Sequence, residues 1–193
     1  MLKNSVGTIL LLTVLVASAW AGSISGKVTA GPGTSVVYVE AISGRTFPAP
    51  SRHLLMDQKG LRFEPHILVV QQGETVDFQN SDSVQHNVFW PSIGGDKKAS
   101  HNMGTWPKGE KKSWKFDHPG VTPLFCNVHP EMSGYIVVSP TPYYSETDAG
   151  GNYTIKDIPD GSYTVTAWHE GMKPKSQPIQ VSGAAKAEFT LSK

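Results

Sequence analysis

Short β-type runs separated by turn residues recur along the chain from residue 22 onward, and they constrain its fold more than any other feature of the sequence. The runs are rich in Val, Ile, Phe, Tyr and Thr, and Gly, Pro, Asn and Asp separate them. No segment combines a sustained period of 3.6 residues with helix caps. The sequence therefore predicts an all-β protein built as an antiparallel sandwich or barrel. The predicted strands are 24–29, 36–41, 67–70, 75–79, 84–90, 112–116, 124–126, 135–138, 153–155, 163–167, 179–181 and 187–191.

The first 21 residues have the pattern of a cleaved signal peptide. Lys3 supplies the positive charge, residues 6–16 are mainly apolar, and Ala19 and Ala21 are the small residues before the predicted cleavage point. An uncleaved membrane anchor is the alternative, but the apolar run is shorter than the roughly 20 residues that a spanning helix needs. We therefore expect a periplasmic or otherwise secreted protein that begins at Gly22 and has no transmembrane segment.

The net charge and the single cysteine limit which partners the protein can bind and which state its thiol can have. Residues 1–21 carry one lysine and no acid, so cleavage lowers the formal net charge from +1 to zero. A neutral chain argues against nucleic acid as a partner, because phosphate binding needs a basic surface. Cys126 is the only cysteine in the sequence, so the chain cannot form an internal disulfide. In an oxidising compartment such a thiol is either buried and inert or occupied by a ligand.

The residues that follow Cys126 form a metal-binding pattern. Cys126, His129 and Met132 occur at Cys-x-x-His-x-x-Met spacing, and His86 lies 40 residues before the cysteine. Two imidazoles, one thiolate and a weak axial thioether form the trigonal site that suits copper in electron transfer. Metal coordination would also explain the lone thiol, because it keeps the sulfur deprotonated and protected from exchange. The alternative is a buried cysteine beside surface histidines.

The remaining five histidines have no second ligand at metal-binding spacing. We expect four of them to be solvated side chains, namely His53, His66, His101 and His118. His169 lies between Trp168 and Glu170, and we expect it at the end of a strand rather than in a second metal site.

Residues from about 55 to 139 resemble the cupredoxin, or blue copper, family, and the ligand loop has the short spacing of the amicyanins. The segments that carry the resemblance are Phe63-Glu-Pro, Gly73-Glu-Thr-Val-Asp-Phe-Gln-Asn, His86-Asn-Val, Pro119-Gly and Gly134-Tyr-Ile-Val-Val, together with the Cys126 loop. The resemblance implies one type 1 copper ion with His86, Cys126, His129 and Met132 as ligands. It also implies that the amide of Asn87 donates a hydrogen bond to the cysteine sulfur and tunes the reduction potential.

The C-terminal residues resemble a different family. Thr147-Asp-Ala-Gly-Gly-Asn-Tyr-Thr-Ile and Ile158-Pro-Asp-Gly-Ser-Tyr-Thr-Val are similar to the transthyretin-like β-sandwich called the carboxypeptidase regulatory domain. That family usually opens with a strand pair like the one in residues 24–39, which here lies about a hundred residues upstream. The resemblances therefore imply a cupredoxin Greek-key β-sandwich inserted in, or joined to, a small transthyretin-like β-sandwich. A single continuous fold is the alternative.

Prolines mark both crossings between the two predicted sandwiches, as is common in linkers. They are Pro48, Pro50, Pro140 and Pro142. The predicted divisions of the chain are a signal peptide at 1–21, the first part of the transthyretin-like sandwich at 22–50, the copper domain at 51–140, and the second part of the sandwich at 141–193.

These patterns together predict an exported type 1 copper protein that carries single electrons between redox partners such as a cytochrome or a dehydrogenase. The alternatives are a copper storage or delivery protein, or a structural binding module with a copper site. An enzyme is disfavoured, because the sequence has no His-x-His pair for a multicopper centre and four protein ligands leave no open position for substrate.

Two surface features are predicted for the carrier. The resemblance implies that His129 reaches the surface through an apolar patch. Pro130 follows it directly, and Pro123, Leu124 and Val128 can supply an apolar rim. Between residues 96 and 115 the sequence has six lysines and two acids. This excess of positive charge is either a solvated loop or a docking patch for an acidic redox partner.

Overall fold

The structure is a computed structural model that describes residues 21–193. Within that range it contains seventeen β-strands, one short 3-10 helix, η1 (Lys97–Ala99), and no α-helix, which confirms the predicted all-β class. No helix in this part of the chain is long and apolar enough to cross a membrane. The predicted signal peptide lies outside the described residues except for Ala21, which begins strand β1.

The larger of two β-sandwiches contains strands β3 to β11. One sheet has the order β4-β3-β6-β9 and the other has the order β5-β11-β10-β7-β8. The strands are β3 (His53–Gln58), β4 (Phe63–Glu64), β5 (Ile67–Gln71), β6 (Thr75–Asn80), β7 (His86–Trp90), β8 (His101–Trp106), β9 (Lys111–Lys115), β10 (Gly120–Phe125) and β11 (Ser133–Ser139). Their inward side chains form an apolar core that includes Phe78, Trp90 and Ile136.

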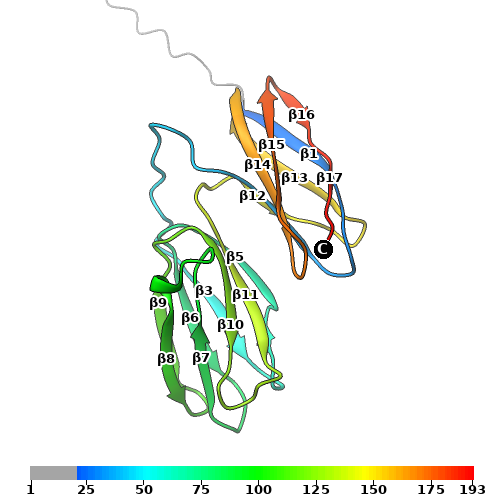
Figure 1. Ribbon diagram of the computed structural model, residues 1–193. Helices are drawn as coiled ribbons and strands as arrows, with labels where there is room; N and C mark the ends of the chain where they lie inside the picture. The colour runs from blue at the N-terminus through cyan, green and yellow to red at the C-terminus, as the bar shows by residue number, and fades with distance from the viewer. Residues whose placement is uncertain (1–20) are drawn as a thin grey trace, which may run out of the picture.

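The smaller sandwich combines strands from both ends of the chain. One sheet has the order β13-β1-β16 with β17 also paired to β1, and the other has the order β12-β2-β14-β15. The strands are β1 (Ala21–Thr29), β2 (Ser35–Val39), β12 (Tyr144–Glu146), β13 (Asn152–Pro159), β14 (Gly161–His169), β15 (Lys175–Val181), β16 (Ala184–Lys186) and β17 (Phe189–Thr190). Figure 1 shows β1 lying beside these late strands, with the larger sandwich below them.

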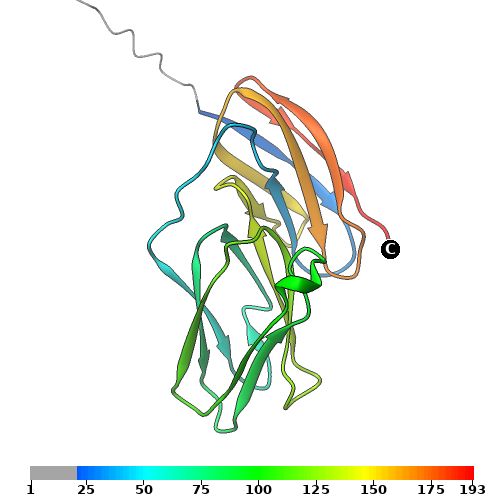
Figure 2. The same ribbon diagram turned by 60° about the vertical axis from the view of Figure 1, so that its left-hand side comes forward.

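Strand β11 is buried on both faces, and this burial joins the two sandwiches. Its alternate residues Ile136 and Val138 point into the core of the larger sandwich. Val137 packs instead with Trp168 from β14 of the smaller sandwich. A strand with two buried faces needs a nearly continuous apolar run, which explains the Tyr-Ile-Val-Val sequence. The two sandwiches are seen packed together in Figure 2 as well as in Figure 1.

Three strands of the larger sandwich, β3, β4 and β8, were not predicted from the sequence, and β4 has only two residues. In β3 only Met56 and Gln58 are buried, and in β8 only Trp106 is buried. Neither strand therefore shows the alternation of apolar and polar residues that marks a half-buried strand. A smaller difference concerns β10, which ends at Phe125, so Cys126 lies in the loop rather than in the predicted strand 124–126.

Candidate metal centre

One predicted ligand comes from strand β7, and the other three come from the loop between β10 and β11. His86 is the first residue of β7, and Cys126 follows the last residue of β10. Phe125 pairs antiparallel with Phe89 near the end of β7, so the chain that follows β10 runs back towards the beginning of β7, where Cys126 and Asn127 contact Asn87. His129 and Met132 lie in the loop between β10 and β11, at the lower end of the larger sandwich in Figure 1.

The imidazoles of His86 and His129 and the sulfur of Cys126 face one another. The two Nδ1 atoms lie 3.0 Å apart, and His129 Nδ1 lies 3.9 Å from Cys126 Sγ. Ligand atoms that bind one ion at about 2.0–2.3 Å can be no more than roughly 4.5 Å apart, and both separations meet this limit. Within residues 21–193 these three form the one group of His, Cys, Asp or Glu side chains close enough to hold a metal ion.

The candidate site is shielded from water on most sides. His86, Cys126 and Met132 are buried, whereas His129 is partly exposed. Met132 belongs to the same apolar cluster as Cys126, and its backbone N–H donates to the His129 carbonyl at 3.0 Å. The site therefore has one solvent-facing histidine and one internal histidine. Thiolate and imidazole donors in an apolar surrounding suit a copper ion that changes between Cu(I) and Cu(II).

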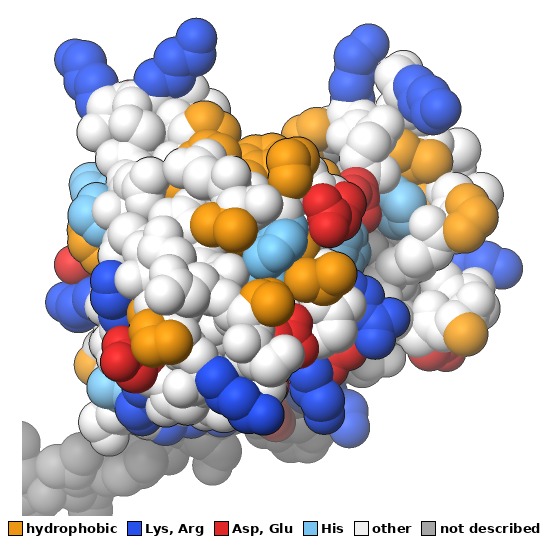
Figure 3. Space-filling view, turned by 90° about the horizontal axis from the view of Figure 1, so that it is seen from below, with side chains coloured by type: hydrophobic (Ala, Val, Ile, Leu, Met, Phe, Trp, Pro, Cys, Tyr) orange, Lys and Arg blue, Asp and Glu red, His pale blue; other side chains and the backbone are white. Residues whose placement is uncertain are grey.

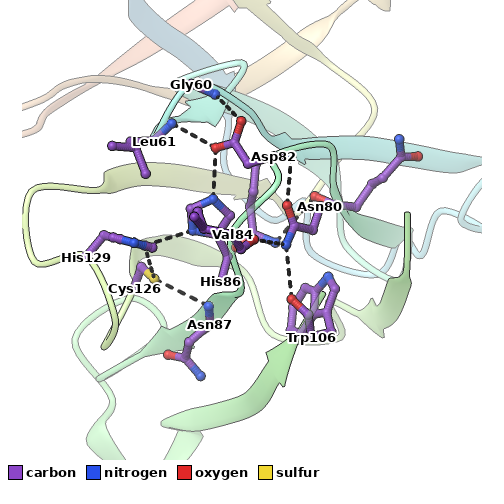
Figure 4. Close-up of polar contacts among 12 residues, drawn as sticks. Gly60, Leu61, Asn80, Asp82, Val84, His86, Asn87, Trp106, Cys126 and His129 are labelled. Atoms are coloured by element: carbon purple, nitrogen blue, oxygen red, sulfur yellow. Dashed lines mark hydrogen bonds and ion pairs between the residues drawn. The ribbon is translucent and has the colours of Figure 1, made fainter. Parts of the chain in front are cut away.

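Asn87 connects the cysteine to its surroundings. Its backbone N–H donates to Cys126 Sγ at 3.3 Å, as the dashed lines of Figure 4 show. Its side-chain Nδ2 donates to the Asn102 side chain and to the Gly104 carbonyl, both at 2.8 Å. Its Oδ1 accepts from the backbone N–H of Asn127 at 3.2 Å. One side chain thus fixes the start of the ligand loop against β8.

The sequence analysis did not identify Asp82, which lies on the far side of the internal histidine. Its Oδ2 is 2.9 Å from His86 Nε2. The carboxylate also accepts from the backbone N–H groups of Gly60 and Leu61, at 2.7 and 2.9 Å. Burial raises the pKa of Asp82, but these two N–H groups and His86 outweigh it and lower the pKa to about 2. Only its position four residues before His86 could have drawn attention to it.

The other histidines have separate partners. His53 bonds to Asp77 at 2.9 Å, and His66 bonds to Glu170 at 2.7 Å. His101 stacks on Trp114 with 3.9 Å between ring centroids, and His118 is exposed. As predicted, His169 ends a strand, β14, where it is buried. His53, His66 and His118 are exposed to solvent, as predicted, whereas His101 is partly buried.

One residue of the predicted apolar rim around His129, Leu124, does not reach the surface. Leu124 is fully buried and cannot contribute, because the alternation of β10 points it into the core. The large apolar side chains exposed in this region are Leu61, Val84 and Val128, at 42%, 44% and 47%. Figure 3 views the molecule from this end and shows hydrophobic side chains around a histidine, with Lys and Arg at the margins.

Comparison with known proteins identifies both parts of the chain. Residues 51–139 match the family of copper binding proteins described as plastocyanin/azurin. Residues 135–192 match the carboxypeptidase regulatory-like domain. Both predicted resemblances are therefore confirmed.

Several individual proteins are similar to part of this chain. Plastocyanin of Scenedesmus fuscus is 34% identical over 89 residues, which cover 42% of this chain and 91% of plastocyanin. Among solved structures, a variant of amicyanin in its Cu(I) form is 26% identical with a TM-score of 0.42, covering 45% of this chain and 82% of amicyanin. A copper-containing nitrite reductase from Thermus scotoductus is 24% identical with a TM-score of 0.42, covering 51% of this chain and 25% of the reductase. The match to plastocyanin and its family, with the His-Cys-His cluster, confirms one type 1 copper ion as the cofactor. The chain belongs to the plastocyanin/azurin family of copper-binding electron-transfer proteins.

Proposed function

We propose that the protein is an exported carrier that passes single electrons between redox partners through a copper ion held by His86, Cys126, His129 and Met132. The observation that carries this proposal is the convergence of two imidazole Nδ1 atoms and one thiol sulfur, all within 4.8 Å of one another, in a mostly buried site. When bound there, copper supplies a one-electron couple between Cu(I) and Cu(II). Met132 would be the fourth and weakest ligand.

The protein's own residues limit rearrangement between the two oxidation states. His86 is fixed by Asp82, and Cys126 receives the Asn87 N–H. The ligand loop is held at its start by the Asn87 side chain and at its end by antiparallel pairing of Phe125 with Ser133. A preorganised ligand set does not have to reorganise when an electron arrives or leaves, and this rigidity favours rapid transfer.

The exposed edge of His129 is the proposed route for electrons. It is the one ligand of the four that is partly exposed. Val128 and Pro130 flank it in sequence and are exposed, and Leu61 and Val84 add apolar surface near the Asp82 and His86 segment. An apolar face of limited size suits brief, weak docking of a redox protein.

The lysines of residues 97–115 would steer an acidic partner, such as a cytochrome or a dehydrogenase. Lys97, Lys98 and Lys108 are exposed. Lys111 and Lys115 form ion pairs with Asp77 and Asp117, at 2.7 and 2.8 Å. These pairs reduce the contribution of the two lysines to the positive electrostatic potential of the surface. Steering by the remaining positive charge should weaken as salt increases.

The proposed role is that of a carrier rather than a copper store or an enzyme. A protein that delivers copper would be expected to expose its sulfur ligands for exchange, but Cys126 and Met132 are both buried.

The proposal that the protein is exported is supported by the signal-peptide pattern of residues 1–21. We also propose that the copper domain extends over 51–140 and that 22–50 with 141–193 form the transthyretin-like sandwich. The sheet membership of β1 and β2 supports this division.

An electron carrier should exchange electrons faster than it loses its copper ion, whereas a copper-storage protein should release the ion faster than it exchanges electrons. The full chain loaded with copper should give a reversible one-electron couple in voltammetry. Electron exchange between its oxidised and reduced forms should be much faster than loss of Cu(I) to a chelator. His129→Gln should abolish the fast exchange, and His118→Gln, at an exposed histidine outside the cluster, should not. Copper loss faster than electron exchange in the wild type would contradict the carrier proposal.

A further inference from the structure

We infer that Asp82 is a positioning residue that fixes the tautomer of His86 and lowers the reduction potential of the copper site. This inference rests on the proposed ligand set, because it treats His86 as a ligand. Asp82 is not a ligand itself, since its carboxylate contacts the imidazole nitrogen that faces away from His129.

The two nitrogens of His86 have different surroundings. Nδ1 lies 3.0 Å from His129 Nδ1, and Nε2 lies 2.9 Å from Asp82 Oδ2. An ionised carboxylate only accepts hydrogen bonds, so the Nε2 atom must carry the proton. Nδ1 then keeps its lone pair, directed at His129 in the Cys126 cluster. Asp82 thereby selects the tautomer of His86 that can bind a metal ion.

The Asp82 carboxylate can fix the orientation of the His86 ring because other hydrogen bonds fix the carboxylate itself. Gly60 and Leu61 donate to its two oxygens from the turn between β3 and β4. Both residues have positive φ, 63° and 57°, and Leu61 adopts this conformation although it is not a glycine. The turn thus aims two consecutive N–H groups at a single acceptor, as Figure 4 shows.

The segment that carries Asp82 is also fixed. The backbone N–H of Asp82 donates to Asn80 Oδ1 at 2.9 Å. The Nδ2 of buried Asn80 in turn donates to the Val84 carbonyl at 2.8 Å and to the Trp106 carbonyl at 3.0 Å. These bonds anchor the short connection between β6 and β7 to the end of β8. The carboxylate therefore has a defined position relative to the His86 ring.

A negative charge in this place has an electronic consequence. The Asp82 side chain is only 17% exposed, so water screens it weakly. A carboxylate that accepts a hydrogen bond from a ligating imidazole makes that imidazole a stronger electron-pair donor to the metal. A stronger electron-pair donor and a nearby negative charge both stabilise Cu(II) more than Cu(I). Asp82 therefore favours the oxidised state.

The test compares Asp82→Asn with Glu131→Gln, which removes one negative charge at an exposed residue of the ligand loop. Changing an outer partner of a ligating histidine typically weakens metal affinity by about 10–100-fold. We expect Asp82→Asn to weaken Cu(II) relative to Cu(I) by about tenfold, which for one electron raises the potential by about 59 mV. Glu131→Gln should give a clearly smaller increase. Equal shifts in the two variants, or none in Asp82→Asn, would overturn the inference.

A second readout uses the copper-free chain. Nitrogen-15 NMR of the wild type should show His86 protonated at Nε2, and Asp82→Ala should give a mixture of tautomers. A wild-type His86 protonated at Nδ1 would overturn the inference. If Asp82→Ala does not fold, the potential of Asp82→Asn still decides. Failure of the proposed function would be seen separately, as a wild type without the intense colour of thiolate-bound copper.

Discussion

The backbone N–H of Asn87 donates to the sulfur of Cys126 at 3.3 Å, joining the second residue of strand β7 to a residue 39 positions later. The Asn87 side chain adds three hydrogen bonds, to Asn102, Gly104 and Asn127. Adjacent residues of β7 thus provide a proposed ligand, His86, and the N–H group that contacts the cysteine sulfur. Because the donor is a backbone group, its position depends on how the Asn87 side chain holds the strand.

Replacement of that side chain should destabilise the protein even without copper. Asn87→Ala removes a side chain that is only 3% exposed and leaves the N–H of Asn127 and the Gly104 carbonyl without this partner. A buried polar group left unpaired costs about 1–3 kcal/mol. Urea unfolding of the copper-free chain should show a loss of this size. Exposed Asn127→Ala is the matched control, and an equal effect of the two changes would contradict this account.

Met132→Gln should keep copper bound and lower the reduction potential. The amide oxygen is a harder donor than a thioether, so it favours Cu(II), and a weak axial ligand contributes little to retention. Voltammetry and metal analysis of the purified variant would measure both effects. Met103→Gln, at a partly buried methionine of β8, is the control and should leave the potential near that of wild type. Complete loss of copper from Met132→Gln would show that the site is built differently.

A charge beside the exposed histidine should slow electron transfer without changing the copper site. Val128 is 47% exposed and directly precedes His129. We expect Val128→Glu to reduce the rate of transfer to a partner about tenfold at low salt, equivalent to about 1.4 kcal/mol of weaker docking. Leu55→Glu introduces the same charge at an exposed apolar residue of β3 and should have little effect. Stopped-flow measurements in which the two variants transfer equally fast would place the electron exit elsewhere.

Acid should remove a stabilising contribution from Asp77. Burial raises the pKa of its carboxyl, but hydrogen bonds from Lys111, Ser113 and His53 and the charge of Lys111 lower it from 3.8 to about 2. A carboxyl with a lower pKa in the folded state stabilises the fold above its unfolded pKa and loses this effect as pH falls. The contribution should therefore be full above pH 3.8 and disappear towards about pH 2.

Unfolding of the copper-free chain at several pH values would measure this effect. The difference in stability between wild type and Asp77→Asn should be largest near neutral pH and should shrink through the acid range. Asp57→Asn, at a carboxyl in the neighbouring strand β3, controls for the loss of one negative charge. A difference between wild type and Asp77→Asn that does not change with pH would contradict this explanation.

The sequence was informative where a function needs residues that are close along the chain. Cys126, His129 and Met132 are close enough in sequence to be recognised as a ligand loop, and His86 offered the second imidazole 40 residues before Cys126. Asp82 could not be assigned in this way. Its contact with His86 depends on the turn at Gly60 and Leu61, about twenty residues upstream, and a single carboxylate has no distinctive pattern.

Strand prediction failed where burial is irregular. Strand β8 has one fully buried residue, Trp106, and includes Gly104 at φ 77°. Its sequence therefore shows neither a strong β propensity nor alternation. Leu124 was assigned to the surface by its nearness to the ligand loop, but the alternation of β10 directs it inward. Position relative to the pleat decides the side of the sheet, and a one-residue difference reverses it.

The visible absorption spectrum of the copper-loaded protein tests the assignment of the copper site most directly. Charge transfer between a Cys126 thiolate and Cu(II), in a site completed by His86 and His129, should give an intense colour. Cys126→Ser should remove that colour, while His118→Gln, at an exposed histidine outside the cluster, should retain it. A wild-type protein with only the faint absorption of nitrogen-ligated Cu(II), or a Cys126→Ser variant that remains intensely coloured, would contradict the assignment of the copper site.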